Sequence, residues 1–455
     1  MTRVWHRRVI VLRARALGPL AALALLTAAS PAALAHPVLT LSVSEHSVSI
    51  TPGGKAAPPD ETFPITVTLG HTFLSFEHHG KRYIEDFATG RAYALSLATQ
   101  TYEEDSLYSN IGFRVHELEN RMYLGRLLTA AKIDTDHFVP AILENEFAIE
   151  IPGANTAIDA DAKGDERSFR WKGRELLALS RASLPVPKEY AGEYWRFLRY
   201  FTGGHPKIFR ELAGYEGVPR QLRIHISNVY EVTRTIRVTG IELRADESYS
   251  LAAATRAPSS TEPGKTLATL AAEGPAGVAA AVVVTKAERD AFLAEGKMLE
   301  AFLRHLSVVI ENGDTSPDWL LANRARMQGD PDVARVAGAL NPASAAEAEK
   351  AVKTLEELRD VDPAGRYLLN VFRGNILSNL GRTQAGIESL LAALRVNPHL
   401  TGAWIDLGGM YNTAYDPVLA WACWDTARRL APSHLGLKVA DDLERKLRTE
   451  HPEFF

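Results

Sequence analysis

The stretch AWIDLGGMYNTAYDPVLAWACWDTARRLAPSH, residues 403–434, decides the fold of the C-terminal part of the chain. Its regularly spaced positions are Trp404, Leu407, Gly408, Tyr411, Ala420, Trp424, Ala427 and Pro432, in the pattern W-x2-L-G-x2-Y…A-x3-aromatic-x2-A-x4-P. The corresponding positions 34 residues earlier hold Gly374, Leu377, Gly381, Leu390, Ala393 and Pro398, with departures at Asn370, Arg373 and Gly386. A degenerate third copy ends near Pro363 and has Ala351, Leu355 and Leu358 in register after a one-residue shift.

This spacing predicts pairs of antiparallel helices that stack on one another. Small residues at Gly408 and Ala420 let two helices approach closely, while Trp404, Tyr411 and Trp424 fill the space between units. Each unit can bury its apolar face only against a neighbour. We therefore expect an all-α repeat region with units at 332–365 (degenerate), 367–400 and 401–434, closed by a polar capping helix at 435–449.

The pattern resembles the tetratricopeptide repeat. The resemblance implies that the first helix of each repeat lines a groove for an extended protein or peptide partner. Asparagine amides can both donate to and accept from a peptide backbone. The groove positions that we expect to bind the partner are Asn375, Ser378, Asn379, Asn412 and Thr413. The alternative is that these are solvated polar residues on a short array.

The N-terminal residues predict export. Residues 1–35 hold five arginines and no acid, then the apolar run Leu20–Leu26 and the cleavage-like triplet Ala33-Leu34-Ala35, as in a secretory signal peptide. We expect a periplasmic or extracellular protein. No later stretch is long and apolar enough to predict an integral membrane span.

The net charge of the mature chain excludes one class of binding partner. Without residues 1–35 the chain has 46 basic and 55 acidic residues, a net charge of −9. Nucleic acid is therefore not an expected partner, because phosphate binding needs a basic surface. Cys423 is the only cysteine, which excludes an intramolecular disulfide.

Residues 36–252 predict an antiparallel β-rich unit with helices, so that the whole chain belongs to the α+β class. Apolar residues alternate with period two in short segments between residues 64 and 105, which indicates hairpins. Further strands are expected at 146–151, 169–171, 176–179, 221–228 and 234–244, and helices at 113–132 and 188–201. The hairpin style x-Ile-x-Asp-Phe…Gly-Arg-x-Tyr-x-Leu over residues 60–245 is similar to periplasmic lipoprotein-carrier and related envelope domains. That resemblance implies a curved sheet that carries an apolar ligand.

Residues 253–283 predict a linker, because they are rich in Ala, Pro, Gly, Ser and Thr. The helical region is then expected at 284–455. Two separate domains follow from this division, and residues 36–252 should fold when residues 365–455 are deleted.

Catalytic and metal chemistry find little support in the sequence. His78 and His79 are adjacent, and successive strand residues point to opposite faces, so the two cannot ligate one ion from a regular strand. Cleavage after Ala35 would expose His36, which with His46 or His71 could form a copper site, but no further motif supports this. No Gly-x-Ser-x-Gly, His-Glu-x-x-His, phosphate loop or Cys-x-x-Cys occurs.

We therefore predict an exported, non-catalytic scaffold with no metal or cofactor, which binds a protein or peptide partner through its repeats. The alternatives are a carrier of a lipid-like ligand, or an enzyme, with the active surface in the β-rich unit.

Overall fold

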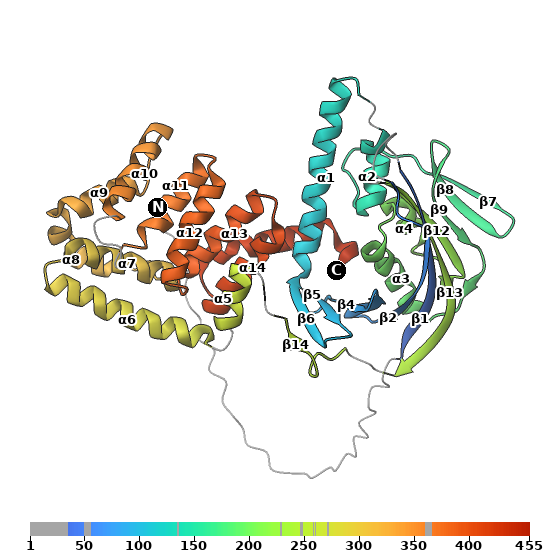
Figure 1. Cartoon of the computed structure of the whole chain (residues 1–455), viewed down its shortest axis with the longest axis horizontal. Coiled ribbons are helices and arrows are strands. Elements are labelled where there is room, and N and C mark those ends of the chain that lie inside the picture. Colours follow the sequence, from blue (N-terminus) through green and yellow to red (C-terminus); the bar gives the residue numbers. More distant parts are fainter. Residues whose placement is uncertain are drawn as a thin grey trace, which may run out of the picture.

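The computed structural model describes residues 35–49, 56–133, 136–227, 230–245, 249–257, 259, 261–270, 273–359 and 366–455. The predicted signal peptide, residues 1–35, lies outside the described residues except for Ala35. The predicted α+β class is confirmed: an N-terminal sheet unit (residues 35–256) is followed by a helical region (residues 262–455) (Figure 1).

The sheet unit is built on one 12-stranded sheet in the order β14-β6-β5-β4-β3-β2-β1-β13-β12-β9-β8-β7. Its pairs are antiparallel except β14 with β6, which are parallel. A second, two-stranded sheet pairs β10 with β11. The strands are β1 (Ala35–Ser49), β2 (Glu61–Leu69), β3 (Phe73–His78), β4 (Lys81–Asp86), β5 (Arg91–Ser96), β6 (Thr101–Ser106), β7 (Asp159–Lys163), β8 (Glu166–Trp171), β9 (Arg174–Ser180), β10 (Ser183–Leu184), β11 (Val218–Pro219), β12 (Gln221–Ser227), β13 (Tyr230–Ala245) and β14 (Thr255–Arg256).

Strand β1 lies at the centre of the sheet and joins its two halves. It pairs with β13 from Ala35 to Ser49 and with β2 on its other side. Leu39, Leu41 and Val43 are buried at alternate positions, which is the period of a strand with one face on the core. This strand was not among those predicted, although its alternation was visible in the sequence.

Helices cover the concave face of the sheet. They are α1 (Leu107–Ala130), α2 (Pro140–Phe147), α3 (Lys188–Phe201) and α4 (Pro206–Leu212), with a 3₁₀ turn η1 (Asp136–Phe138). Helices α2, α3 and α4 lie within the curve of the sheet, while α1 stands at its edge and projects beyond it (Figure 1). The aromatic segment predicted as a helix at 188–201 is α3, and its Tyr194 and Phe197 side chains are fully buried.

The strand predicted at residues 146–151 is wrong. Helix α2 begins with Pro140 at its first turn and ends at Phe147, and Ala148 then adopts the left-handed conformation with φ of 58°. Ile149 and Ile151 are buried in the loop that follows. Their burial produces the same apolar alternation as a strand, which explains the error.

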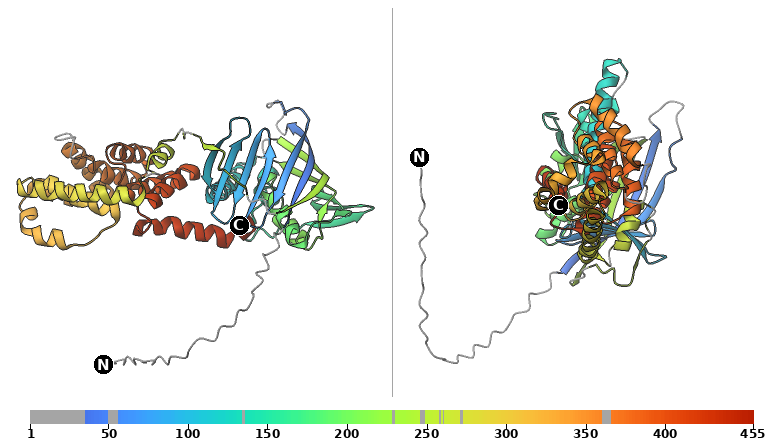
Figure 2. Two further views of the ribbon diagram at one scale, coloured as in Figure 1. Left: turned by 90° about the horizontal axis from the view of Figure 1, so that it is seen from below. Right: turned by 90° about the vertical axis from the view of Figure 1, so that its left-hand side faces the viewer.

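The helical region contains α5 (Glu262–Leu270), α6 (Gly274–Ala294), α7 (Met298–Asn312), α8 (Asp318–Gln328), α9 (Pro331–Ala339), α10 (Ala345–Arg359), α11 (Leu369–Asn379), α12 (Thr383–Val396), α13 (Thr401–Thr413), α14 (Pro417–Leu430) and α15 (Lys438–Glu450), with 3₁₀ turns η2 (Leu435–Leu437) and η3 (Pro452–Phe454). Pairs α11/α12 and α13/α14 pack as hairpins, and the array extends away from the sheet (Figure 2). Helix α14 begins 34 residues after α12, as in the predicted repeat.

The segment predicted as a linker contains ordered helices. Helix α5 and the first half of α6 fall within residues 253–283, and α5 packs against α14. An ion pair from Glu262 to Arg395 holds α5 to α12. The segment is rich in alanine, which has the highest helix propensity. Its small side chains therefore indicated close packing rather than a connector.

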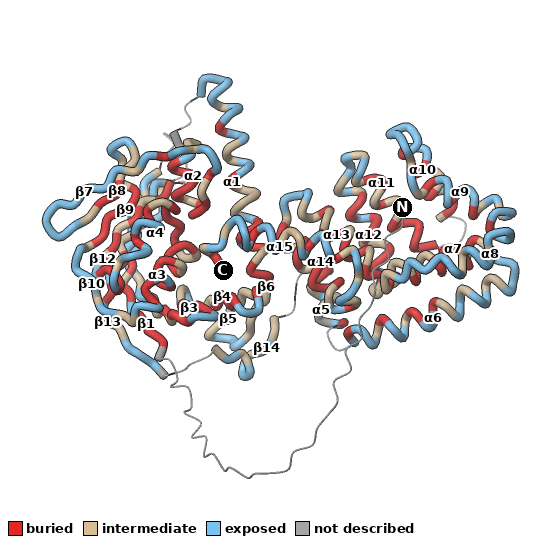
Figure 3. Tube along the Cα trace, turned by 180° about the vertical axis from the view of Figure 1, so that it is seen from behind, coloured by how far each residue is buried: buried red, intermediate tan, exposed pale blue. Residues whose placement is uncertain are grey.

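The two parts of the chain share a hydrophobic core. Trp421 and Trp424 of α14, Leu447 of α15 and Phe454 of η3 belong to the same buried cluster as the sheet and α3. Buried segments are drawn red in Figure 3, among them parts of α3 and α14. The C-terminus lies beside α3 within the curve of the sheet (Figure 1). The end of the helical region therefore completes the core of the sheet unit. Among the described helices, none combines the length and apolar character that a bilayer crossing requires.

Candidate binding groove

The five predicted binding residues lie on the first helices of the two clear repeats. Asn375, Ser378 and Asn379 are on α11, and Asn412 and Thr413 are at the end of α13. The structure brings Asn375 and Asn379 to one cavity and places the others elsewhere.

A cavity of 730 Å³, which we call the α11 groove, lies between α11 and the loop that joins α9 to α10. Its lining residues are Leu340, Asn341, Pro342, Ala343, Ser344, Ala345, Ala348, Phe372, Asn375, Ile376, Asn379 and Leu380. None of these side chains carries a charge. The groove thus combines apolar walls with three asparagine amides, those of Asn341, Asn375 and Asn379, a composition suited to a peptide segment.

Asp406 of α13 fixes the orientation of Asn375. The Asn375 Nδ2 donates to Asp406 Oδ2 at 2.7 Å, which uses one of its two N–H groups. The other branch of the amide is the carbonyl oxygen, an acceptor. Burial raises the pKa of the Asp406 carboxyl, and the hydrogen bond from Asn375 opposes this effect. Asp406 was not predicted; the available signal was a single acid within the apolar helical stretch AWIDLGGM.

The other three predicted residues have different surroundings. Asn412 Oδ1 lies 3.2 Å from His116 Nε2 of α1, and Thr413 Oγ1 donates to Gly409 O of its own helix at 2.9 Å. Ser378 lies on α11 near the close approach to Gly386 of α12 and does not line the groove. Of the predicted set, Asn375 and Asn379 line the α11 groove, Asn412 contacts the sheet unit, and Ser378 and Thr413 do neither.

Helix α1 closes the array at the α13/α14 end. The His116 ring meets Tyr415 edge-on, with centroids 5.4 Å apart. A Cβ added to Gly112 would lie only 3.0 Å from the Trp421 ring, which shows how closely α1 approaches α14. A groove that continued across both repeats would end at this contact.

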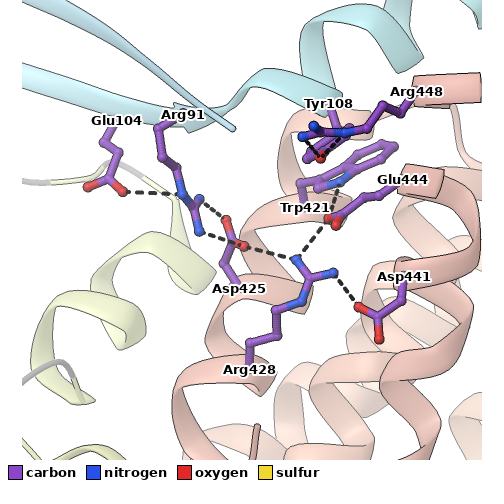
Figure 4. A network of polar contacts seen from close by, with 9 residues as sticks. All are labelled: Arg91, Glu104, Tyr108, Trp421, Asp425, Arg428, Asp441, Glu444 and Arg448. Atoms are coloured by element: carbon purple, nitrogen blue, oxygen red, sulfur yellow. Dashed lines mark hydrogen bonds and ion pairs between the residues drawn. The ribbon is translucent and has the colours of Figure 1, made fainter. Parts of the chain in front are cut away.

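A network of ion pairs joins the sheet unit to the last repeat (Figure 4). Arg91 of β5 donates two hydrogen bonds to Asp425 of α14, one of 3.0 Å, and also lies 3.8 Å from Glu104. Arg428 donates to Glu444 and Asp441 of α15 at 2.8 and 2.7 Å. Burial by itself would lower the pKa of Arg91, but the hydrogen bond to Asp425 and the charges of Asp425 and Glu104 together outweigh it, and the pKa is raised.

The same network continues into aromatic contacts. Trp421 Nε1 donates to Glu444 at 3.1 Å, and Arg448 of α15 donates to the Tyr108 hydroxyl of α1 at 2.6 Å (Figure 4). Bidentate and charge-assisted bonds of this kind fix geometry as well as supplying energy. The network indicates a rigid joint between the two parts.

Within the described ranges, no group of three or more His, Cys, Asp or Glu side chains is placed to hold a metal ion. The chain was also compared with models of known protein families and with curated proteins, and neither comparison gave a match.

Proposed function

We propose that this protein is an exported, non-catalytic scaffold whose helical repeats, of the tetratricopeptide type, bind an extended segment of a protein or peptide partner in the α11 groove. The observation that carries the proposal is that Asn375 and Asn379, selected from the repeat pattern, line one cavity of 730 Å³.

The chemistry of the groove supports binding of a peptide backbone. With its amide held by the bond to Asp406, Asn375 offers a carbonyl oxygen to a backbone N–H, and the exposed Asn379 one turn later can donate and accept. Phe372 and Ile376 supply apolar contacts beside them. In this proposal Asp406 positions the amide and does not touch the partner.

The sheet unit gives less support to the alternative of a carrier for an apolar ligand. Such a carrier needs an apolar hollow. The curve of this sheet is occupied by α2, α3, α4 and the C-terminus, and Tyr190, Tyr194 and Phe197 of α3 are fully buried there (Figure 1). The groove on the helical region is therefore the better supported site.

The test is affinity capture with residues 36–455 from envelope and secreted fractions, followed by binding measurements with the purified partner. We expect Asn375→Ala with Asn379→Ala to weaken binding at least tenfold. The control is Gln384→Ala, which removes an exposed amide from α12 outside the groove. Equal affinity of both variants for the captured partner would count against the α11 groove as its site.

A further inference from the structure

A second cavity, of 570 Å³, lies between the sheet unit and the C-terminal segment. Arg199 of α3 and Pro206 and Arg210 of α4 border it on one side, and Glu450, Pro452 and Glu453 border it on the other. Residues of the sheet unit and of the chain end therefore form this site together. It is separate from the α11 groove.

Arg199 is a buried cation that forms no ion pair with a described residue, although Glu450 and Glu453 line the same cavity. The residue is only 9% exposed, and its Nε has no hydrogen-bond partner. Across the described part of the chain, no carboxylate lies within ion-pair distance of its guanidinium group. The guanidinium instead lies over the Phe209 ring, 4.9 Å from the centroid.

Two neighbouring arginines, Arg210 and Arg114, differ from Arg199 because each has polar partners in the protein. Arg210 pairs with Glu150 at the rim of the cavity. Arg114 directs its guanidinium to the carbonyl oxygens of Phe147, Arg199 and Tyr200, the closest at 3.0 Å. Their charges or N–H groups are thus satisfied by the protein, whereas the buried Nε–H of Arg199 has no partner.

An unpaired buried charge is costly, and proteins normally compensate it with an opposite charge. Burial lowers the pKa of Arg199 to about 10, although the nearby Glu453 opposes this effect. The guanidinium remains protonated at neutral pH. The cavity beside it offers space for an anion that could pair with Arg199 directly.

The other charges at the cavity restrict which anion fits. With Arg210 paired to Glu150, the other charges that line the cavity are those of Arg199, Glu450 and Glu453, so a doubly charged anion would be repelled more strongly than a singly charged one. His451 adds no second cation at neutral pH, because burial lowers its pKa below the usual value. Pro206 and Pro452 offer apolar contacts to the rest of a ligand.

We propose that this cavity binds a small monocarboxylate, with Arg199 as its counter-ion and the prolines against its alkyl part. A bound carboxylate would connect α3 to the C-terminal segment. The proposal does not depend on the function proposed for the α11 groove.

The test is titration of residues 36–455 with acetate, butyrate and inorganic phosphate, followed by ligand-observed NMR. We expect butyrate to bind most tightly and phosphate most weakly, and Arg199→Gln to weaken butyrate binding at least tenfold. Glu453→Gln should strengthen it several-fold, because it removes a neighbouring negative charge without touching the core. Glu388→Gln, an exposed site on α12, is the control and should change nothing.

Three results would overturn the proposal. The first is no binding of either carboxylate to the unmodified protein. The second is tighter binding of phosphate than of butyrate. The third is butyrate affinity that Glu453→Gln leaves unchanged, a variant that stays informative even if Arg199→Gln fails to fold.

Discussion

At the scale of single residues, Gly408 shows most directly how the repeat pattern dictates packing. A Cβ at this position would lie 2.4 Å from Trp424 Nε1, and this ring is buried and donates to Ile405 O at 3.2 Å. Only glycine therefore fits between α13 and α14. The sequence pattern predicted this close approach, and the geometry agrees with it.

We predict that Gly408→Ala lowers the free energy of unfolding by about 1–3 kcal/mol, because Trp424 must shift to admit the methyl group. Gly409→Ala is the matched control: it lies in the same helix, and nothing is within 4 Å of its added Cβ. There the gain in helix propensity should stabilise by about 0.5–1 kcal/mol. Urea unfolding of the two variants measures the difference, and equal effects would contradict the packing described here.

Glu85 of β4 provides a pH-dependent prediction at the same scale. Burial raises its pKa to about 7, with Arg114 opposing and Asp105 adding to the effect, and its Oε2 has no hydrogen-bond partner. The folded state therefore holds this proton more tightly than the unfolded state, in which the pKa is near 4.3. Stability falls as the pH rises from about 4.3 to about 7, by on the order of 3 kcal/mol.

Because glutamine cannot ionise, Glu85→Gln should leave stability at pH 4 nearly unchanged and raise it at pH 8. Chemical unfolding of both proteins at these two pH values measures the effect. A stability difference that is the same at both values would show that Glu85 does not ionise in the folded protein within this range.

At the scale of elements, helices and strands could be predicted from the sequence where their apolar residues recur with one regular period. Segments that are buried without such a period were predicted wrongly. The hairpins between residues 64 and 105 and the helix at 188–201 could be predicted because their apolar residues follow one period. The alternation at 146–151 comes from a buried loop, and the small residues at 253–283 pack in helices. The pattern of apolar residues in one sequence indicates which positions are buried. It indicates a helix or a strand only where the buried positions recur with a regular period.

The candidate site could be predicted only in part for a similar reason. Repeat spacing placed Asn375 and Asn379 on the first helix of a repeat, and both line the α11 groove. It carried no information on α1, whose His116 contacts Asn412, or on Asp406, which orients Asn375. The contact between His116 and Asn412 and the contact between Asp406 and Asn375 each join segments that are far apart in the sequence.

The 3₁₀ turn η3 at the end of the chain is predicted to contribute to the stability of the sheet unit. Phe454 is fully buried, its ring meets Tyr200 edge-on, and its carbonyl oxygen accepts from the Tyr200 hydroxyl at 2.8 Å. Phe454→Ala should lower the free energy of unfolding by about 3–5 kcal/mol. Leu435, which is 77% exposed, offers the control Leu435→Ala, for which we expect little change in the same urea titration. Similar losses for the two variants would mean that the chain end is not part of the core.

At the scale of the whole molecule, the sheet unit and the helical region share one hydrophobic core. We therefore no longer expect them to fold as two independent domains. Trp421, Trp424, Leu447 and Phe454 pack with the sheet, and Arg91 bonds to Asp425 across the joint. We therefore predict that a protein lacking residues 365–455 shows no cooperative thermal transition by circular dichroism, whereas residues 36–455 unfold cooperatively. A cooperative transition in the truncated protein would restore the two-domain division.

The rigid joint also has a consequence for binding. With α1 closing the α13/α14 end of the array, the α11 groove is held at a fixed position relative to the sheet. A partner bound there would meet one defined surface rather than a mobile tail.

The most direct test of the central claim is site-specific photo-crosslinking of the protein in cells. A photoreactive residue would be placed at Asn379 in the α11 groove and, as the control, at the exposed Gln384 of α12. We predict a discrete crosslinked partner from position 379, absent from position 384 and lost when Asn375→Ala is added. Crosslinks to the same partner from both positions, or to none from position 379, would contradict a binding scaffold that acts through the α11 groove.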